Sequence, residues 1–346
     1  MSNGIFGALL SGPTDALHRA TERWAAQPVD LELPAQTAAP YPARQTTLAH
    51  PVTLRGPGTF FGKETRTLTF EPGTEEGWWV DRTDLPEDLP TRVSVRNVWT
   101  TGNIVSNIVL RSGAPHNYVR MVEHIIALKL GLGLDRLNVR IDSGDPPLFD
   151  RGSLDLIEAL EQAGIEEIAV PARYFTVREK VCACTPAGAF VSLAPCTGPA
   201  PRLRLDAAVD FPTAIGRQRL RFDLDGANFR TGAVARTNTS AAKKLYCQTV
   251  GRIFADIRNL GYTNENILVA GRRRYMNAPR LLHGGKSLEA AWHRAVLDLL
   301  AALALIEEGR FVGDVISYKA GHALDVKLIA LLYLNGLLVP FEPRAA

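Results

Sequence analysis

The sequence predicts an α+β protein made of two similar halves. In each half, segments that alternate apolar and polar residues come first, and segments with the apolar spacing of helices follow. The stretch MVEHIIALKLGLGLDRLNVRI of the first half also matches, in outline, WHRAVLDLLAALALIEEGRFVGDVISY of the second. We therefore expect two α+β domains that face each other, over residues 45–170 and 171–340.

The composition agrees with two soluble cores. A chain of 346 residues exceeds the usual size of one core, and 46% hydrophobic with 22% charged residues is ordinary for a globular protein. A formal charge of only +3 does not favour nucleic-acid binding. No apolar run reaches 18 residues and no signal-peptide pattern opens the chain, so we expect a cytoplasmic protein without a transmembrane segment. The four cysteines are expected to be reduced structural thiols.

Residues 1–44 are expected to form an N-terminal extension and a proline-rich linker. Residues 13–27 have the composition of a short helix that begins near Pro13, and four prolines interrupt the chain between residues 28 and 42. Such a segment can pack as a lid or tether. An extension without a specific role is the simpler interpretation.

The first domain is expected to open with a hairpin. Residues 45–54 and 66–72 alternate apolar and polar residues on either side of the glycine-rich turn GPGTFFGK. Beyond it we expect a helix at 118–133, a strand at 134–142, a helix at 153–164 and a connector between the domains at 164–171.

The second domain is expected to contain a helix that is buried on all sides. The segment from Trp292 to Ile306 is apolar on almost every face, yet it contains His293, Arg294 and Asp298. Because buried charges need compensation, these side chains require a metal ion, each other, or a salt-bridge partner from elsewhere. We expect strands before this helix at 173–180, 202–211 and 219–225.

Two further histidines lie at positions that suit chemistry. Glu123 precedes His124 on an otherwise apolar helix, so one residue could bind a metal while the other transfers a proton, although a satisfied core histidine is the commoner outcome. His322 lies where a glycine turn leads into a helix, and can interact there with a developing anion or cap the helix. The sequence GGKS at 284–287 lacks the earlier glycine of a phosphate loop and is expected to be an ordinary loop.

Short motifs between residues 45 and 338 resemble those of the UDP-3-O-acyl-N-acetylglucosamine deacetylase family, the zinc enzymes of the committed step of lipid A synthesis. Each motif alone is weak, but their number and order are specific. They are VEH at 122–124, GLGLDRLNV at 131–139, the D-x-G-S segment at 150–153, AGIEE at 163–167, ART at 235–237, the E-x-x-x-H of Glu289 and His293, and YKAGHAL at 318–324.

This resemblance implies a fold and a reaction. The helices would be sandwiched between the two sheets, with the active site at the domain junction. His124, His293 and Asp298 would hold Zn²⁺, with Fe²⁺ as an alternative, and would leave one position for water. The substrate would be UDP-3-O-acyl-N-acetylglucosamine or a related acylated amide, and a transient contact with a membrane surface is compatible with it. The oligomeric state does not follow from the resemblance.

The resemblance also implies roles for the side chains around the metal. Glu123 would act as general base toward the attacking water. Thr237 would donate a hydrogen bond to the tetrahedral oxyanion, and protonated His322 would stabilise its charge and help to protonate the departing amine. Lys319 and Arg294 are candidates for the nucleotide phosphates, because fixed cations suit a diphosphate.

Two departures from the family pattern affect the metal site. His293 and Asp298 are spaced H-x-x-x-x-D, whereas the family has H-x-x-x-D. On a regular helix an i,i+5 pair is displaced by roughly 140 degrees, so we predict a single-turn π-bulge between them. Ala302 stands where the family carries a second carboxylate that orients the catalytic histidine, and Asp325 or Asp314 is the candidate replacement.

Two other departures affect the substrate. Phe60 and Phe61 stand where the family has His-Ser, and TNTS after Arg236 replaces an aromatic-rich start of the acyl channel. Three hypotheses follow: the lipid A deacetylase, an amidase on another acylated amino sugar, and a metal-poor binding or regulatory relative. Two histidines and a carboxylate also describe the non-haem iron oxygenase triad, but the motif order favours hydrolysis.

Overall fold

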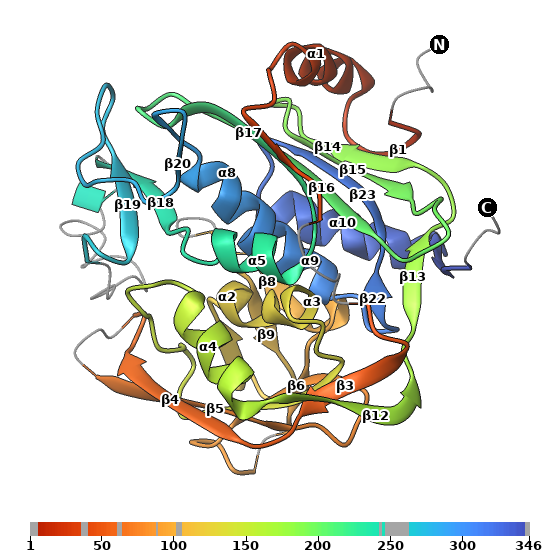
Figure 1. Ribbon diagram of the computed structural model, residues 1–346, viewed down its shortest axis with the longest axis vertical. Coiled ribbons are helices and arrows are strands. Elements are labelled where there is room, and N and C mark those ends of the chain that lie inside the picture. Colours follow the sequence, from red (N-terminus) through yellow and green to blue (C-terminus); the bar gives the residue numbers. More distant parts are fainter. Residues whose placement is uncertain are drawn as a thin grey trace.

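The computed structural model describes residues 6–35, 41–60, 64–87, 89–101, 106–241, 244–245 and 263–342. In these residues two β-sheets lie on opposite sides of a layer of helices (Figure 1). The lower sheet of that view comes from the first half of the chain and the upper sheet mainly from the second, which confirms the predicted α+β sandwich. Cys182, Cys184 and Cys196 are buried free thiols, as expected, whereas Phe61 and Cys247 lie outside the described residues.

Within the described residues, the lower sheet has the strand order β4 (Val52–Pro57), β5 (Thr65–Pro72), β11 (Arg136–Ile141), β6 (Gly77–Arg82) and β7 (Thr91–Arg92). The predicted hairpin is the antiparallel pair β4 and β5, although its first strand, expected at 45–54, begins only at Val52 because residues 44–48 form a separate strand that pairs elsewhere. The predicted strand at 134–142 is β11. Alternate side chains such as Leu68, Phe70 and Val139 are buried, so the alternation of apolar residues marks the face that packs on the helices.

The helices of the first half pack on this sheet. They are α2 (Glu123–Ile126), α3 (Leu128–Gly131) and α4 (Leu154–Ala163), of which α4 was predicted at 153–164. The helix predicted to begin at residue 118 is wrong at its start. Tyr118–Arg120 forms β10, and Met121 takes a left-handed φ of 57° before α2 begins. Val119 is buried in either arrangement, so apolar spacing could not separate a strand from a helix there.

Within the described residues, the upper sheet has the strand order β1 (Ala8–Ser11), β14 (Val181–Cys184), β15 (Phe190–Pro195), β23 (Gly313–Tyr318), β16 (Leu203–Phe211), β17 (Gly216–Asp223) and β2 (Leu31–Leu33). Both edge strands therefore come from the N-terminal segment, and both pair in parallel with their neighbours.

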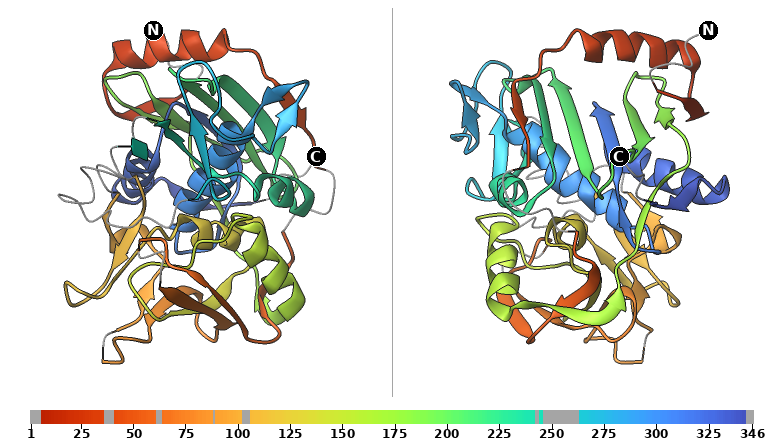
Figure 2. Two further views of the ribbon diagram at one scale, coloured as in Figure 1. Left: turned by 90° about the vertical axis from the view of Figure 1, so that its left-hand side faces the viewer. Right: turned by 45° about the vertical axis from the view of Figure 1, so that its right-hand side comes forward.

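The N-terminal helix α1 (Thr14–Ala25) lies across the outer face of the upper sheet (Figure 2). Its residues Leu17 and Ala20 join a small apolar cluster with Phe6 and, from the sheet, Phe190 and Tyr318. The predicted helix at 13–27 is thus confirmed. Residues 6–35 supply two strands and a covering helix to the second half of the fold.

Short sheets connect these layers. The expected connector at 164–171 is itself a strand, β12 (Ile165–Pro171), which pairs with β3 (Arg44–Leu48) and leads to the upper half. The remaining short strands are β8 (Val98–Thr100), β9 (Val109–Arg111) and β10; β13 (Tyr174–Val177), β22 (Arg310–Phe311) and β24 (Leu338–Pro340); β18 (Thr237–Ser240) and β19 (Ile267–Ala270); and β20 (Leu282–His283) with β21 (Lys286–Ser287). In the GGKS sequence, Gly284 and Gly285 form the turn of the β20–β21 hairpin and Lys286–Ser287 is β21, so only the first half of the expected loop is a loop.

The helices of the second half, together with one short turn of the first half, fill the centre of the molecule. They are the 3₁₀ turn η1 (Val95–Asn97) from the first half, α5 (Gly226–Gly232), α8 (Glu289–His293), the π-helical turn η2 (Arg294–Leu299), α9 (Leu300–Ala304) and α10 (His322–Leu334). Nearly every residue from Glu289 to Leu305 is buried, as the apolar pattern predicts. Among the described residues, no helix is both long and apolar enough to span a bilayer.

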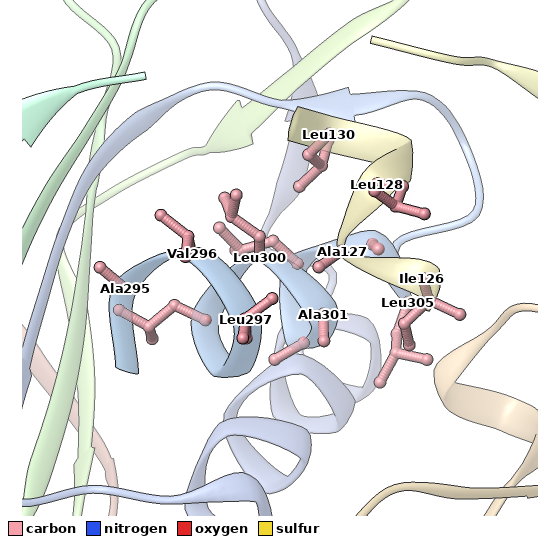
Figure 3. Close-up of a cluster of buried hydrophobic side chains, with 14 of the residues drawn as sticks. Ile126, Ala127, Leu128, Leu130, Ala295, Val296, Leu297, Leu300, Ala301 and Leu305 are labelled. Carbon is pink, nitrogen blue, oxygen red and sulfur yellow. The ribbon is translucent and has the colours of Figure 1, made fainter. Parts of the chain in front are cut away.

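The two halves meet through apolar side chains of these helices. Figure 3 shows Ile126, Leu128 and Leu130 of the first half beside Leu297 and Leu300 of the second. Burial of this kind contributes about 25 cal/mol for each Å² of apolar surface removed from water. The junction is therefore part of one continuous core, and groups on either side of it are held in fixed positions.

Two buried cations add polar contacts to this junction. The Lys129 ammonium on α3 donates to the backbone oxygens of Ala304 and Ile306, at 3.0 and 2.9 Å, where α9 ends. Arg310 on β22 binds Asp135 of the first half through two hydrogen bonds of 2.8 and 2.6 Å. Both contacts join the halves away from the predicted site residues.

Candidate active site

The first half supplies Glu123 and His124 at the start of α2. The left-handed turn at Met121 ends β10 and lets the helix begin at Glu123, while Ile125 and Ile126 are buried in the core. Glu123 is buried, and its Oε2 accepts a hydrogen bond of 3.2 Å from the backbone N–H of Ile108. His124 Nδ1 lies 3.3 Å from Ser153 Oγ, which fixes the orientation of its ring.

The second half supplies His293 and Asp298 from either end of a π-helical turn. The six residues Arg294–Leu299 form η2 between α8 and α9, so the predicted π-bulge is confirmed. His293 Nδ1 lies 3.4 Å from Asp298 Oδ1, although a regular helix would direct these two side chains to different faces. The wider turn thus absorbs the additional residue and keeps the pair together.

Thr237 links the histidines of the two halves. Its Oγ1 lies 3.1 Å from His293 Nε2 and 3.5 Å from His124 Nε2. The preceding residue Arg236 is buried and is bound by Glu289, which also accepts from the Arg236 backbone N–H. Glu289 lies one helical turn before His293, so a single ion pair positions both Thr237 and the helix that carries His293.

His322 lies in the first turn of α10, as the sequence predicts. Its Nε2 lies 3.4 Å from Asp298 Oδ1 and 4.0 Å from Glu123 Oε1. Its Nδ1 is buried and has no hydrogen-bond partner among the described residues. Asp325 instead binds Arg294, and Asp314 lies with Arg202, so neither candidate takes the hydrogen-bonding place of the carboxylate missing at Ala302.

Burial and neighbouring charges set the protonation of this cluster. Burial, aided by His293, lowers the pKa of His124 to about 3, and burial also lowers the pKa of His293. Both imidazoles are therefore neutral near pH 7. Burial raises the pKa of Glu123 above its ordinary value, against the effect of His322. Burial acts to raise the pKa of Asp298 too, but His322 and His293 outweigh it and leave the pKa lowered.

The side chains of His124, His293 and Asp298 are of the types that bind a divalent cation. Two neutral imidazoles and an ionised carboxylate are ligands that Zn²⁺ binds at catalytic sites. Asp298 Oδ1 is buried and makes no hydrogen bond, which is typical of an oxygen with another partner. In the described part of the chain, however, no group of three or more His, Cys, Asp or Glu is arranged tightly enough to count as a ready metal site. The residues fit by type and position, and their side chains would have to close around the ion.

The two cations predicted for phosphate binding differ in their surroundings. Lys319 ends β23 with a left-handed φ of 53°, and its side chain is one-third exposed, with Nζ 3.8 Å from Asp210 Oδ2. Arg294 is buried, and its guanidinium is occupied by Asp325, Ser317 and Asp298. The structure therefore does not favour Arg294 as a phosphate ligand, and only Lys319 stays a prediction in that role.

An apolar pocket adjoins the cluster. It has an empty volume of about 440 Å³, which includes open solvent, and its wall contains both His124 and Thr237. The rest of the wall is mainly apolar, and includes Met121, Pro147, Leu148, Phe149 and Leu156. A substrate with an apolar part next to the reacting bond fits such a wall.

Three residues that support the site were not assigned roles by the sequence, namely Ser153, Arg236 and Glu289. All three lie within the short motifs at 150–153, 235–237 and 289–293. Membership of a motif was the available sign that these residues matter. Their partners could not be predicted, because each contact joins residues that lie far apart in the chain. Sequence spacing alone gives no partner for such a residue.

The fold and the clustered acid, base and hydroxyl groups are those of a hydrolase built at the junction of two α+β halves. The family described as UDP-3-O-acyl N-acetylglycosamine deacetylase matches residues 45–333. The chain belongs to this family of deacetylases, which are amide hydrolases. The resemblance found in the sequence is thereby confirmed.

Individual relatives agree with the family match. A UDP-3-O-acyl-N-acetylglucosamine deacetylase of Psychrobacter sp. is 27% identical over 296 residues, which cover 84% of this chain and 92% of the relative. Proteins of the same name from Bdellovibrio bacteriovorus and Synechocystis sp. are each 28% identical, and cover 84% and 82% of this chain and 89% and 96% of the relatives. The similarity thus spans both halves of the fold.

Proposed function

We propose that this chain removes the acetyl group of UDP-3-O-acyl-N-acetylglucosamine, a step of lipid A synthesis, with the help of a bound divalent metal ion. The observation that carries the proposal is a connected series of contacts between the halves. Thr237 lies beside His124 and His293, Asp298 lies beside His293 and His322, and His322 lies near Glu123. The names of the family and of its relatives supply the substrate.

His124, His293 and Asp298 are the proposed metal ligands, with Zn²⁺ as the expected ion and Fe²⁺ as an alternative. Such an ion, when bound, makes a water molecule more acidic and polarises a carbonyl group. The Nε2 atoms of both histidines face the Thr237 hydroxyl, and Asp298 Oδ1 lies beside the other ring nitrogen of His293, Nδ1. Ser153 holds the His124 ring from its other nitrogen.

The remaining side chains account for the movement of protons. Glu123 takes a proton from the water whose oxygen adds to the acetamide carbonyl carbon, and its raised pKa suits a general base. Thr237 donates a hydrogen bond to the oxyanion of the tetrahedral intermediate. Protonated His322 stabilises the same charge and helps to protonate the amine nitrogen as the C–N bond breaks, and the proton that Glu123 took from water is the other source. The products are acetate and the free amino sugar.

Substrate orientation is proposed to come from the surroundings of this cluster. Lys319, which is partly exposed near the start of α10, binds a phosphate of the nucleotide. The apolar pocket beside His124 and Thr237 receives an apolar part of the substrate.

An amidase that acts on another acylated amino sugar is the second candidate. One observation favours it: Thr237–Ser240, which replaces the aromatic start of the acyl channel, is a half-buried strand of small polar side chains. A polar wall of this kind gives little binding energy to a long acyl chain.

Mass-spectrometric detection of acetate release from UDP-3-O-acyl-N-acetylglucosamine tests the proposal, with zinc-loaded protein and both long and short 3-O-acyl chains. Glu123→Ala is expected to lower kcat by about 10²- to 10⁴-fold. Glu22→Ala, on the exposed face of α1, is the matched control and should retain full activity. Full activity of Glu123→Ala would contradict the proposed base. Turnover only of other acylated amino sugars would select the second candidate.

A further inference from the structure

Arg294 occupies an unusual position next to the proposed metal ligands. It follows His293 directly, opens the π-helical turn η2, and its side chain is only 3% exposed. Its Nε donates to Ser317 Oγ at 2.9 Å, and its two terminal nitrogens bind the two oxygens of Asp325. A planar guanidinium held at three corners has little freedom to rotate.

The same guanidinium reaches Asp298. Arg294 Nη1 lies 3.5 Å from Asp298 Oδ2, whereas Asp298 Oδ1 faces His293 and His322 and makes no hydrogen bond. Arg294 thus holds Oδ2 of the carboxylate, and Oδ1 is directed toward the two histidines. Asp298 itself lies in a turn with one residue more than a regular helix, so its position depends on such a contact more than it would in an α-helix.

We propose that Arg294, anchored by Asp325 and Ser317, is the positioning residue of Asp298: it fixes the carboxylate so that Oδ1 faces the histidines and can bind the metal. This inference rests on the metal site of the proposed function and gives the buried Arg294–Asp325 pair a role within it. The pair compensates in this chain for the additional residue between His293 and Asp298.

A purely structural role is the competing explanation, and the chain contains a matched control for it. Arg310 also forms a buried two-point ion pair, with Asp135, and also joins distant segments. Besides Asp135, Arg310 binds Thr46 and Gly133, none of which is a proposed metal ligand. Loss of either pair should lower the melting temperature, because it leaves a carboxylate buried without its partner. Only loss of the Arg294 pair should alter a bound metal.

The experiment compares Co²⁺ binding by wild-type protein, Arg294→Lys, Asp325→Asn and Arg310→Lys, with circular dichroism to verify that each is folded. Arg294→Lys keeps the charge but loses the planar fork, and Asp325→Asn keeps Arg294 but weakens its anchor. Both are expected to bind Co²⁺ about 10- to 100-fold more weakly, with a changed visible absorption spectrum. Arg310→Lys should keep the wild-type affinity and spectrum. If Arg294→Lys does not fold, Asp325→Asn carries the test.

Two outcomes would overturn the inference. One is wild-type Co²⁺ affinity and spectrum in folded Asp325→Asn and Arg294→Lys, which would leave the pair a purely structural role. The other is an equal loss of affinity in Arg310→Lys, which would show a general effect of destabilisation. Failure of the proposed substrate is a separate result, seen as normal metal binding by the wild type without acetate release. A wild type that binds no divalent ion would contradict both.

Discussion

Thr237 Oγ1 lies 3.1 Å from His293 Nε2, so a strand of the second half places a hydroxyl against the last residue of α8, directly before the π-helical turn. We expect Thr237→Val, which keeps the shape of the side chain, to lower kcat for acetate release by about 10²-fold with little change in KM, because in the proposed mechanism the hydroxyl stabilises only the oxyanion. Thr231→Val, whose hydroxyl bonds the Ala227 backbone oxygen on α5, is the control. An effect confined to KM would instead indicate a role in substrate binding.

The contact between Ser153 and His124 leads to a prediction about metal affinity. Ser153 Oγ lies 3.3 Å from His124 Nδ1 and orients the ring. We expect Ser153→Ala to weaken Zn²⁺ binding by about 10-fold or more, measured by competition with a chelator, while the fold is retained. Ser192→Ala removes a buried hydroxyl that bonds the Val181 backbone oxygen in the upper sheet, and should leave the affinity unchanged. Equal affinities in both variants would exclude an orienting role for Ser153.

The π-turn predicts where the chain tolerates a deletion. Removal of Ala295 from η2 restores the spacing H-x-x-x-D and lets α8 continue into α9 as a regular helix. Removal of Ala301 from α9 rotates everything beyond it by about 100 degrees and misplaces buried side chains. We expect the Ala295 deletion to keep the helical circular dichroism and a melting temperature close to that of the wild type, and the Ala301 deletion to lose cooperative unfolding. Similar damage from both deletions would contradict the π-helical assignment.

Lys129 predicts a pH dependence of stability. Burial lowers the pKa of Lys129 from 10.5 to about 8. The unfolded chain therefore keeps the proton at pH values where the folded protein has lost it, and the free energy of unfolding rises between pH 8 and pH 10.5. The full gain is roughly 3 kcal/mol.

The measurement compares melting temperatures of the wild type and Lys129→Met at about pH 7.5 and about pH 9.5, so that the other titrating groups cancel. The wild type should gain a few degrees relative to the variant at the higher pH. A constant difference between the two proteins would show that Lys129 titrates normally.

Local patterns in the sequence were sufficient for elements whose burial repeats regularly. Alternation predicted β4, β5 and β11, helical spacing predicted α4, and composition with Pro13 near the start predicted α1. The start of α2 could not be found in this way. Its position depends on the left-handed backbone at Met121, and Val119 fits a strand or a helix equally well.

The site was predictable in a different manner. Motif order, taken from the family resemblance, brought together His124, His293 and His322, and the mismatch between spacing and geometry predicted the π-turn. What the sequence could not give was the choice of partners across long distances. Arg294 was expected to face phosphates, but its guanidinium binds Asp325, which lies thirty-one positions further along the chain. A buried cation takes the nearest fixed carboxylate, and only the fold determines which one that is.

The pairing of the N-terminal strands joins segments that lie far apart in the sequence. Ala8 pairs with Val181, and Leu31 pairs with Leu220, so β1 and β2 find their neighbours only across a long stretch of chain. Contacts of such high sequence separation form late, because a long loop must close first. Until then β14 and β17 present open edges on which another chain could add a strand. The N-terminal segment covers both of these edges, so we expect its pairing to protect the upper sheet from aggregation.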